Sequence, residues 1–198
     1  MIAVPVAPHF GDPIHDAQAA FRGLLKALSR PGTRVPLPGS EMPPAPMGAA
    51  LAAVALTLAD GDCPVWLDAA LDSADIHRYL HIHTNAARVA APEAAVIALI
   101  AEPQDMPQFS VFRNGEAAYP DRSATIVIQV PALEGGGTVT LRGPGIETAT
   151  KIAPRGLPDW FWPAWIENTS RYPLGVDIFL VDRGSVIGLP RTTKVESR

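Results

Sequence analysis

The sequence predicts one α/β or α+β domain built around a mixed β-sheet. Amphipathic helical patterns dominate the first half of the chain, and segments rich in β-branched residues dominate the half beyond Pro120. No internal repeat or low-complexity tract divides residues 1–198, so we expect a single domain. A chain of this length buries about 70% of the surface that it exposes when unfolded, so it can fold without a disulfide or a structural metal.

The first predicted helix follows an irregular N-terminal arm at residues 1–13, where three prolines prevent regular hydrogen bonding. Asp16 suits the N-cap or the first turn of this helix, and Pro31-Gly32 ends it. Helical spacing predicts a buried face composed of Phe21, Leu24, Leu25 and Leu28.

Further elements before Pro120 are predicted to follow one another with short connections. A proline-rich connection at residues 33–48 leads to an alanine-rich helix at residues 48–59, and Asp60-Gly61-Asp62 then forms a turn. The remaining elements are a short strand at residues 64–67, a helix capped by Asp72 or Ser73 that ends near His83, and a buried strand at residues 96–101.

Beyond Pro120 the pattern predicts two hairpins and one helix. Residues 124–130 and 138–142, joined by a triple-glycine loop, are predicted to pair as a hairpin, with a further strand within residues 146–153. Residues 176–181 and 186–189 predict a second hairpin, and residues 190–198 an extended tail. The predicted helix at residues 157–168 carries aromatic side chains that fit either a core or an interface, namely Trp160, Phe161, Trp162 and Trp165.

Composition excludes several classes of protein. The formal net charge of −4 argues against a general nucleic-acid binder, which normally presents a basic face. No apolar stretch reaches the roughly 20 residues that span a membrane, and the N-terminal sequence lacks the pattern of a signal peptide. Cys63 is the only cysteine, so no intrachain disulfide can form. We therefore expect a cytoplasmic protein that binds neither membranes nor nucleic acid.

Basic residues form two candidate binding features. Basic residues recur every four positions along the first predicted helix, at Arg22, Lys26 and Arg30. They form either a solvated face or a surface that binds an acidic partner or a phosphate. Arg191 precedes two threonines in the predicted tail. An Arg with neighbouring hydroxyls can bind a phosphate or a carboxylate. The same residues would also be found in a tail that docks on another chain, so both interpretations stay open.

No arrangement of residues predicts a catalytic or metal site. His77 and His81 lie four apart on one helix, as two zinc ligands would, but Arg78 stands where a zinc protease has Glu. We interpret these histidines as polar surface residues, and His83 as a complement to the negative end of the helix dipole. Asp60 and Asp62 suit a paired-carboxylate site or an ordinary turn. Cys63 suits a small buried hydrophobe better than a nucleophile.

Seven ordered segments resemble one known family. They are DAQxxFRxLLKAxSxPG at residues 16–32, LTLADxDxPVWL at 56–67, HTNA at 83–86, IxIQV at 126–130, LxGPGI at 141–146, PLGVD at 173–177 and LPRTT at 189–193. Together they resemble the H subunit of the bacterial carbon–phosphorus lyase core complex, the PhnH family, over nearly the whole chain. Cys63 stands where that family has Thr, and residues 102–119 match none of its pattern.

The resemblance implies a fold. The family is similar to the pyridoxal-phosphate-dependent transferases, with a three-layer arrangement of a mixed sheet and flanking helices, but without their cofactor. The sequence contains three lysines, Lys26, Lys151 and Lys194, of which Lys151 is the remaining candidate for a Schiff base. We expect no cofactor and no metal; an independent pyridoxal-phosphate enzyme is the weakest of the alternatives.

The resemblance also implies a role within an assembly. Family members act with the G, I and J subunits, and functionally with the L subunit, to convert ATP and an alkylphosphonate into a ribose 1-phosphonate 5-triphosphate. We expect a structural subunit of this transferase that forms a homodimer in isolation. The alternative is a subunit that binds phosphonate or nucleotide directly. Candidate ligand or interface residues for either role are Arg22, Lys26, Asp60, Asp62, His83 and Arg191.

Overall fold

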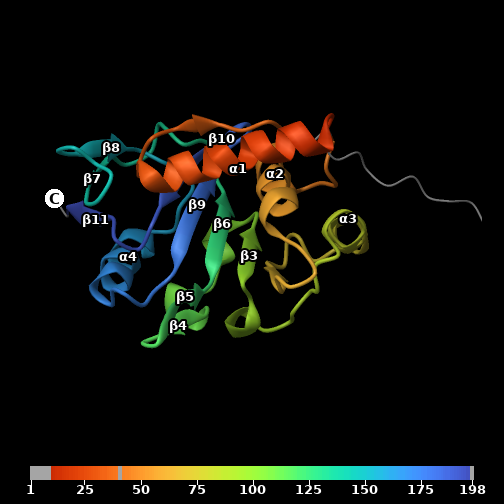
Figure 1. The fold of residues 1–198 in the computed structure, drawn as a ribbon. Helices are drawn as coiled ribbons and strands as arrows, with labels where there is room; N and C mark the ends of the chain where they lie inside the picture. The colour runs from red at the N-terminus through yellow and green to blue at the C-terminus, as the bar shows by residue number, and fades with distance from the viewer. Residues whose placement is uncertain (1–9, 40–41, 197–198) are drawn as a thin grey trace, which may run out of the picture.

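The computed structural model describes residues 10–39 and 42–196, in which a mixed six-stranded sheet is covered on both faces (Figure 1). The helices are α1 (Pro13–Ser29), α2 (Ala49–Leu58), α3 (Ala74–Thr84) and α4 (Phe161–Ser170), with short 3-10 helices η1 (Pro92–Ala94), η2 (Pro103–Asp105) and η3 (Phe109–Val111). The strands are β1 (Val35–Pro36), β2 (Val65–Leu67), β3 (Ile97–Ile100), β4 (Asn114–Glu116), β5 (Tyr119–Ser123), β6 (Thr125–Gln129), β7 (Val139–Arg142), β8 (Thr150–Ile152), β9 (Asp177–Val181), β10 (Ser185–Leu189) and β11 (Lys194–Glu196).

The main sheet has the strand order β1-β10-β9-β6-β3-β2. Strands β2, β3, β6 and β9 run parallel, and β10 turns back antiparallel to β9. Strands buried on both faces are nearly continuous apolar runs, as β3 and β6 show. The predictions of a buried strand near residue 97, of the strand at β6 and of the β9–β10 hairpin are confirmed.

Side chains alternate between the two faces of the main sheet. Val127 of β6 joins the core under α1, α2 and α3, whereas Ile126 and Ile128 join the core on the opposite face. That opposite face is covered by α4 and by a smaller sheet of order β11-β7-β8. The three layers and the mixed sheet therefore agree with the predicted architecture.

Helix α1 begins at a well-defined cap. Asp12 is the N-cap, because its carboxylate Oδ1 accepts hydrogen bonds from the backbone N–H groups of Ile14 (3.2 Å) and His15 (3.0 Å). Asp16 lies in the first turn, and its carboxylate accepts from the N–H of Asp12 at 2.9 Å. Of the two predicted roles for Asp16, the first-turn acid is confirmed. Residues 1–9 of the predicted N-terminal arm lie outside the described residues.

The predicted face of α1 is confirmed only in part. Leu24 is buried and Leu28 packs partly buried against the core, but Phe21 and Leu25 are exposed. The buried side of the helix is completed by small residues, Ala20, Gly23 and Ala27. Ala27 approaches the sheet closely: a Cβ at Gly188 of β10 would lie 2.6 Å from the carbonyl carbon of Ala27, so only small residues fit there. Ala20 packs with Ala53 of α2.

The predicted hairpin between residues 124–130 and 138–142 is also wrong. β6 lies in the middle of the main sheet between β3 and β9, whereas β7 pairs with β8 and β11 in the smaller sheet. A strand that is apolar on both faces gains more burial between two parallel neighbours than in a local hairpin. The predicted strand within residues 146–153 is confirmed as β8.

The C-terminal tail is folded onto the molecule. Thr193 is fully buried, and its carbonyl accepts a hydrogen bond from Nε1 of Trp165 at 2.9 Å. Residues 194–196 then pair with β7 as strand β11. The prediction of an extended tail holds only in the sense that its backbone is extended. The aromatic residues Phe161 and Trp165 pack in the core, which decides between the two interpretations for that pair.

Candidate functional site: a cleft at the carboxyl ends of the parallel strands

A cavity of about 570 Å³ lies where strands β3, β6 and β9 end. Its polar lining comes from five segments of the chain: Gly48, Glu102 with Gln104, Gln129, Arg155, and Asp182 with Arg183. In open α/β sheets, ligands bind outside the carboxyl ends of the parallel strands, because connecting loops diverge there and leave a crevice. Position alone therefore makes this cleft the candidate ligand site.

One wall of the cleft is fixed by a buried carboxylate. Asp68, which follows β2, is 6% exposed. Its Oδ2 accepts hydrogen bonds from the backbone N–H groups of Ala101 and Glu102, both at 2.8 Å, and its Oδ1 accepts from Leu71 N–H at 3.0 Å. These bonds hold the chain directly after β3, so the residues that enter the cleft have a defined backbone position.

A second wall joins β6 to the start of α2. The side-chain Oε1 of Gln129 accepts a hydrogen bond from Gly48 N–H at 2.7 Å, and its Nε2 donates to the carbonyl of Pro46 at 3.1 Å. Gly48 is the N-cap of α2 and supplies no capping side chain. The first turn of α2 therefore presents backbone N–H groups and the positive end of the helix dipole toward this side of the cleft.

The cleft is lined by two arginines, Arg155 and Arg183, and by two acids, Glu102 and Asp182. Arg155 and Arg183 are exposed, and neither guanidinium has an ion-pair or hydrogen-bond partner within the described part of the chain. Asp182 is already neutralised by Arg34, whose Nη2 lies 2.9 Å from its Oδ2. Glu102 is the remaining free carboxylate of the lining. The cleft is thus suited to a ligand that carries negative charge.

The lining offers hydrogen-bonding and charged groups. Among the described residues that line the cleft there is no Ser, Thr, Cys, His, Tyr or Lys. Its carboxylates are Glu102 and Asp182, of which Glu102 is free and is the group of this lining that can act as a base.

None of the six candidate residues from the sequence lines this cleft. Arg22 and Lys26 are exposed on α1, where they form the predicted basic stripe with Arg30. Both side chains are exposed to solvent, and neither lines the cleft. The structure thus places them on a surface and not in a pocket.

Asp60 and Asp62 lie in the turn between α2 and β2, and His83 lies in the last turn of α3. The N–H of Asp62 donates to Oδ1 of Asp60 at 2.9 Å, which is the side-chain-to-backbone bond of an ordinary turn. That N–H lowers the pKa of the Asp60 carboxyl below its usual range. His83 packs against the ring of Tyr79, with centroids 4.8 Å apart. The turn interpretation of the two acids is favoured over a paired-carboxylate site.

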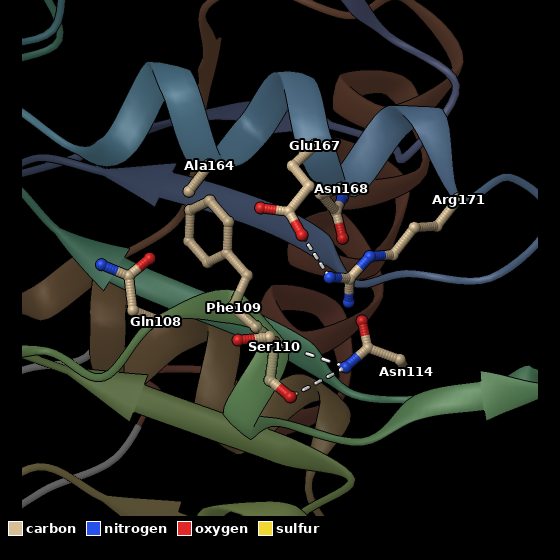
Figure 2. Close-up of a pocket in the computed structure, with 8 residues that line it drawn as sticks. All are labelled: Gln108, Phe109, Ser110, Asn114, Ala164, Glu167, Asn168 and Arg171. Carbon is tan, nitrogen blue, oxygen red and sulfur yellow. Dashed lines mark hydrogen bonds and ion pairs between the residues drawn. The ribbon is translucent and has the colours of Figure 1, made fainter.

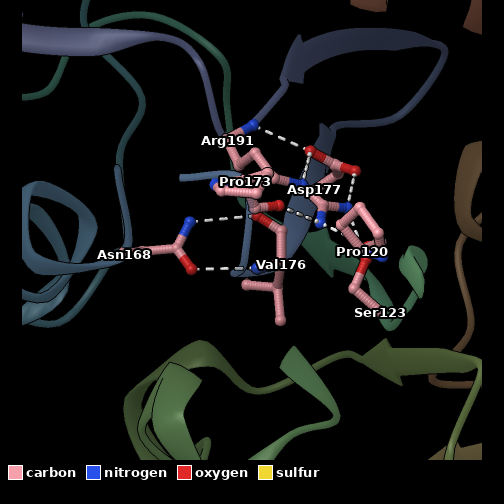
Figure 3. A network of polar contacts seen from close by, with 7 residues as sticks. All are labelled: Pro120, Ser123, Asn168, Pro173, Val176, Asp177 and Arg191. Atoms are coloured by element: carbon pink, nitrogen blue, oxygen red, sulfur yellow. Dashed lines mark hydrogen bonds and ion pairs between the residues drawn. The ribbon is translucent and has the colours of Figure 1, made fainter. Parts of the chain in front are cut away.

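Arg191 is a structural residue, which corrects its place among the candidate ligand residues (Figure 3). Its guanidinium pairs with Asp177 and donates to the carbonyls of Pro120 (2.9 Å) and Pro173 (3.2 Å) and to the hydroxyl of Ser123. With these donors occupied and the side chain 12% exposed, Arg191 has nothing left to offer a phosphate. The sequence could not show this because every partner is at least 14 residues away.

Metal and thiol chemistry find no support in the geometry. Within the described ranges, no group of three His, Cys, Asp or Glu side chains could hold a metal ion. Cys63 is partly buried, and burial together with the neighbouring Asp60 raises the pKa of its thiol. A raised pKa lowers the fraction of reactive thiolate, in agreement with the prediction that Cys63 is not a nucleophile.

A second depression, between η3 and α4, is too small for a substrate (Figure 2). Its volume of about 20 Å³ is the size of one water molecule. Glu167 and Arg171 form an ion pair at its rim, and Asn114 donates to the carbonyl of Phe112 at 2.6 Å. The Oδ1 atom of Asn114 is buried and accepts no hydrogen bond from the described residues, so we expect an ordered water there.

Comparison with known proteins identifies the family. The bacterial phosphonate metabolism protein family (PhnH) matches residues 8–196. The α-D-ribose 1-methylphosphonate 5-triphosphate synthase subunit PhnH of Rhizobium meliloti (strain 1021) is 43% identical over 187 residues, which cover 94% of each chain. The chain belongs to this family. The predicted resemblance is therefore confirmed over nearly its full extent.

A second relative is more distant. HtxG of Stutzerimonas stutzeri, whose name describes a C-P lyase subunit, is 34% identical over 180 residues, 90% of this chain and 85% of that protein. No helix of the described residues is both long and apolar enough to cross a membrane. The matches to the two relatives cover 94% and 90% of this chain.

Proposed function

We propose that the chain is a non-catalytic subunit of an assembly that converts ATP and an alkylphosphonate into a ribose 1-phosphonate 5-triphosphate during phosphonate breakdown. Its partners would be the G, I and J subunits of a carbon–phosphorus lyase core, with the L subunit required for the reaction. It would act in the cytoplasm and without pyridoxal phosphate. Membership of the PhnH family and the name of the Rhizobium relative support this role.

The chemistry of the cleft supports a subunit that does not catalyse the reaction alone. Its described lining combines two free arginines with amides and one free carboxylate, Glu102, and has no hydroxyl, thiol, imidazole or amine nucleophile. Lys151, the remaining Schiff-base candidate, is exposed on β8 beside a groove at α4 and does not line the cleft. A fold related to that of the pyridoxal-phosphate-dependent transferases, without their cofactor, is part of the proposal.

The outer surface of α1 supports a role in assembly, and it is the structural observation on which the proposal rests. Ile14, Phe21 and Leu25 lie on one side of this helix and are 79%, 46% and 52% exposed. Arg22 and Lys26 lie directly beside them. An exposed apolar stripe with a charged margin is typical of a protein–protein contact. We call the five residues together the α1 surface.

In isolation, the same surface offers a route to the proposed homodimer. A surface that is apolar and has no partner lowers its free energy by burying itself against a second copy. Binding of a partner subunit would then compete with self-association, because both use the α1 surface.

The test is capture of partner subunits by a tagged chain with a changed α1 surface. The double variant Phe21→Ser/Leu25→Ser should lose most captured G, I and J subunits while the free protein melts normally. Ile82→Ser is the matched control, because Ile82 is also 52% exposed and lies on another helix, α3. Equal capture by the double variant and the control would remove the α1 surface from the proposal.

A second candidate function is direct binding of a nucleotide or phosphonate in the cleft, and the two unpaired arginines favour it. The double variant Arg155→Ala/Arg183→Ala should abolish a thermal shift caused by ATP or methylphosphonate, whereas Arg78→Ala on α3 should keep it. If the wild-type protein shows no thermal shift with either ligand, direct binding is excluded and the assembly role is the remaining proposal.

A further inference from the structure

A separate pocket lies between α3 and the edge strand β2. Its volume is about 240 Å³. With roughly 30 Å³ for each water-sized group, it has room for about eight such groups. The segment after α3 closes one side, because Arg88 forms a parallel bridge with Val65 of β2. This pocket shares no lining residue with the cleft.

The rim of the pocket carries three nitrogen-bearing side chains. His77 and His81 are one helical turn apart on α3, so both point to the same side of the helix. Arg88 faces them from the segment beyond α3. These groups converge from two elements on one opening, which is the arrangement that recognises an oxyanion.

Asp72 orients two of these groups. Its Oδ1 lies 2.7 Å from Nε2 of His77 and also accepts from Nη1 of Arg88. The pair with Asp72 uses one nitrogen of the guanidinium. The remaining donors of Arg88, Nε and Nη2, have no partner within the described part of the chain. His81 likewise makes no side-chain hydrogen bond there. The rim therefore has positioned but unused donors.

The floor of the pocket is apolar. Val65 and Leu67 of β2 and Leu80 of α3 line it, and Ala86 adds a small side chain. All four are buried, so the floor is rigid. A ligand that fills the pocket must bring apolar atoms to this floor and a charged group to the rim.

We propose that this pocket binds a small organic oxyanion, with a phosphonate, phosphate or carboxylate head at Arg88, His77 and His81, and a short apolar chain on the floor. This site is independent of the cleft and does not rest on the proposed assembly role. The apolar chain distinguishes it from a general phosphate site, because each buried CH₂ contributes about 0.8 kcal/mol, or about fourfold in affinity.

The experiment uses the full chain, with NMR detection of the histidine ring signals and titration calorimetry. The probes are butylphosphonate, methylphosphonate, inorganic phosphate and butyrate. Butylphosphonate should shift the signals of His77 and His81 but not that of His15 on α1. With three CH₂ groups at about fourfold each, it should bind about 60-fold tighter than inorganic phosphate. Comparison of butylphosphonate with butyrate decides which head group the rim prefers.

Three variants locate the site. Arg88→Ala should weaken binding about tenfold or more, as expected for a lost hydrogen bond to a charged group. Ala87→Leu keeps the rim charges but fills the opening, and should exclude butylphosphonate more than phosphate. Arg78→Ala removes one exposed arginine of α3 that does not line the pocket, and should change nothing. Equal weakening by Arg78→Ala and Arg88→Ala, or shifts of equal size at His15, would overturn the proposal.

Discussion

Arg191 and Asp177 form a partly buried ion pair that connects the segment after β10 to the start of β9. Asp177 Oδ1 accepts hydrogen bonds from the backbone N–H of Arg191 at 2.7 Å and from its Nε at 3.1 Å. The two side chains are 12% and 25% exposed. The sequence motif around Arg191 therefore serves to fix the C-terminal segment in place, where it leads into the buried Thr193 and β11.

Breaking this pair should destabilise the protein. Arg191→Ala leaves the Asp177 carboxylate without its main partner, so we expect the free energy of unfolding to fall by about 2–3 kcal/mol. Arg142→Ala is the control, because its pair with Glu196 is about half exposed and should be worth about 1 kcal/mol or less. Urea denaturation of both variants gives the comparison. Similar losses for both would show that Arg191 is not structural.

Close packing of α1 on β10 leads to a second prediction. At Gly188, a Cβ would lie 2.6 Å from the carbonyl carbon and 2.7 Å from the carbonyl oxygen of Ala27, which are backbone atoms that cannot turn away. Gly188→Ala should therefore cost about 1–3 kcal/mol. Gly184→Ala in the same hairpin should be nearly neutral, because nothing lies within 4 Å of its added Cβ. Thermal denaturation checks this, and an unaffected Gly188→Ala would mean that α1 is farther from the sheet.

The link between Gln129 and the start of α2 can be tested in the same way. Gln129→Leu removes the acceptor for Gly48 N–H and the donor to the Pro46 carbonyl, so we expect a loss of about 1–2 kcal/mol. Gln104→Leu breaks only an exposed bond to the carbonyl of Gly156 and should cost less. Chemical denaturation gives both values. A larger loss at Gln104 would contradict the assignment of Gln129 as the wall of the cleft.

The environment of Cys63 predicts its reactivity. Burial, and secondly Asp60, raise the pKa of its thiol, so the native protein should react with iodoacetamide at pH 8 more slowly than free cysteine. Asp60→Asn removes a negative charge, which lowers the pKa of Cys63 and should increase the rate. An unchanged or slower rate would contradict the role given to Asp60.

The same shift predicts a pH dependence of stability. A raised pKa in the folded state means that the native protein holds the thiol proton more tightly than the unfolded chain does. The contribution of Cys63 is therefore complete below the ordinary cysteine pKa of about 8.5 and is lost as the pH rises through the raised value. Denaturation between pH 7 and 10, compared with Cys63→Ala, measures this contribution.

Local signals in the sequence predicted the elements that local physics determines. The helix end at Pro31-Gly32, the cap at Ser73 and the β9–β10 hairpin all depend on residues a few positions apart. The prediction of a β6–β7 hairpin was wrong because burial across the whole sheet decides which strands pair. The prediction for the face of α1 was incomplete because neighbouring segments approach the helix closely. This close approach, and not hydrophobicity, selects the small residues Gly23 and Ala27.

The candidate site was beyond sequence reasoning for a related reason. Gly48, Gln129, Arg155 and Arg183 are separated by 26 residues or more and meet only because parallel strands end at one edge. One signal was available: these residues lie within or beside predicted strand ends and turns, where α/β proteins bind ligands. Arg191, by contrast, has the composition of a phosphate site, and only its distant partners show otherwise.

The most direct test of the account is the composition of the complex that this chain forms. The tagged chain is co-expressed with G, I and J subunits from one phosphonate operon, captured, and analysed by native mass spectrometry and size exclusion with light scattering. The account predicts one stable high-mass complex that contains all four proteins and fails to form with Phe21→Ser/Leu25→Ser. Recovery of the wild-type chain alone, as monomer or homodimer, would contradict the subunit role.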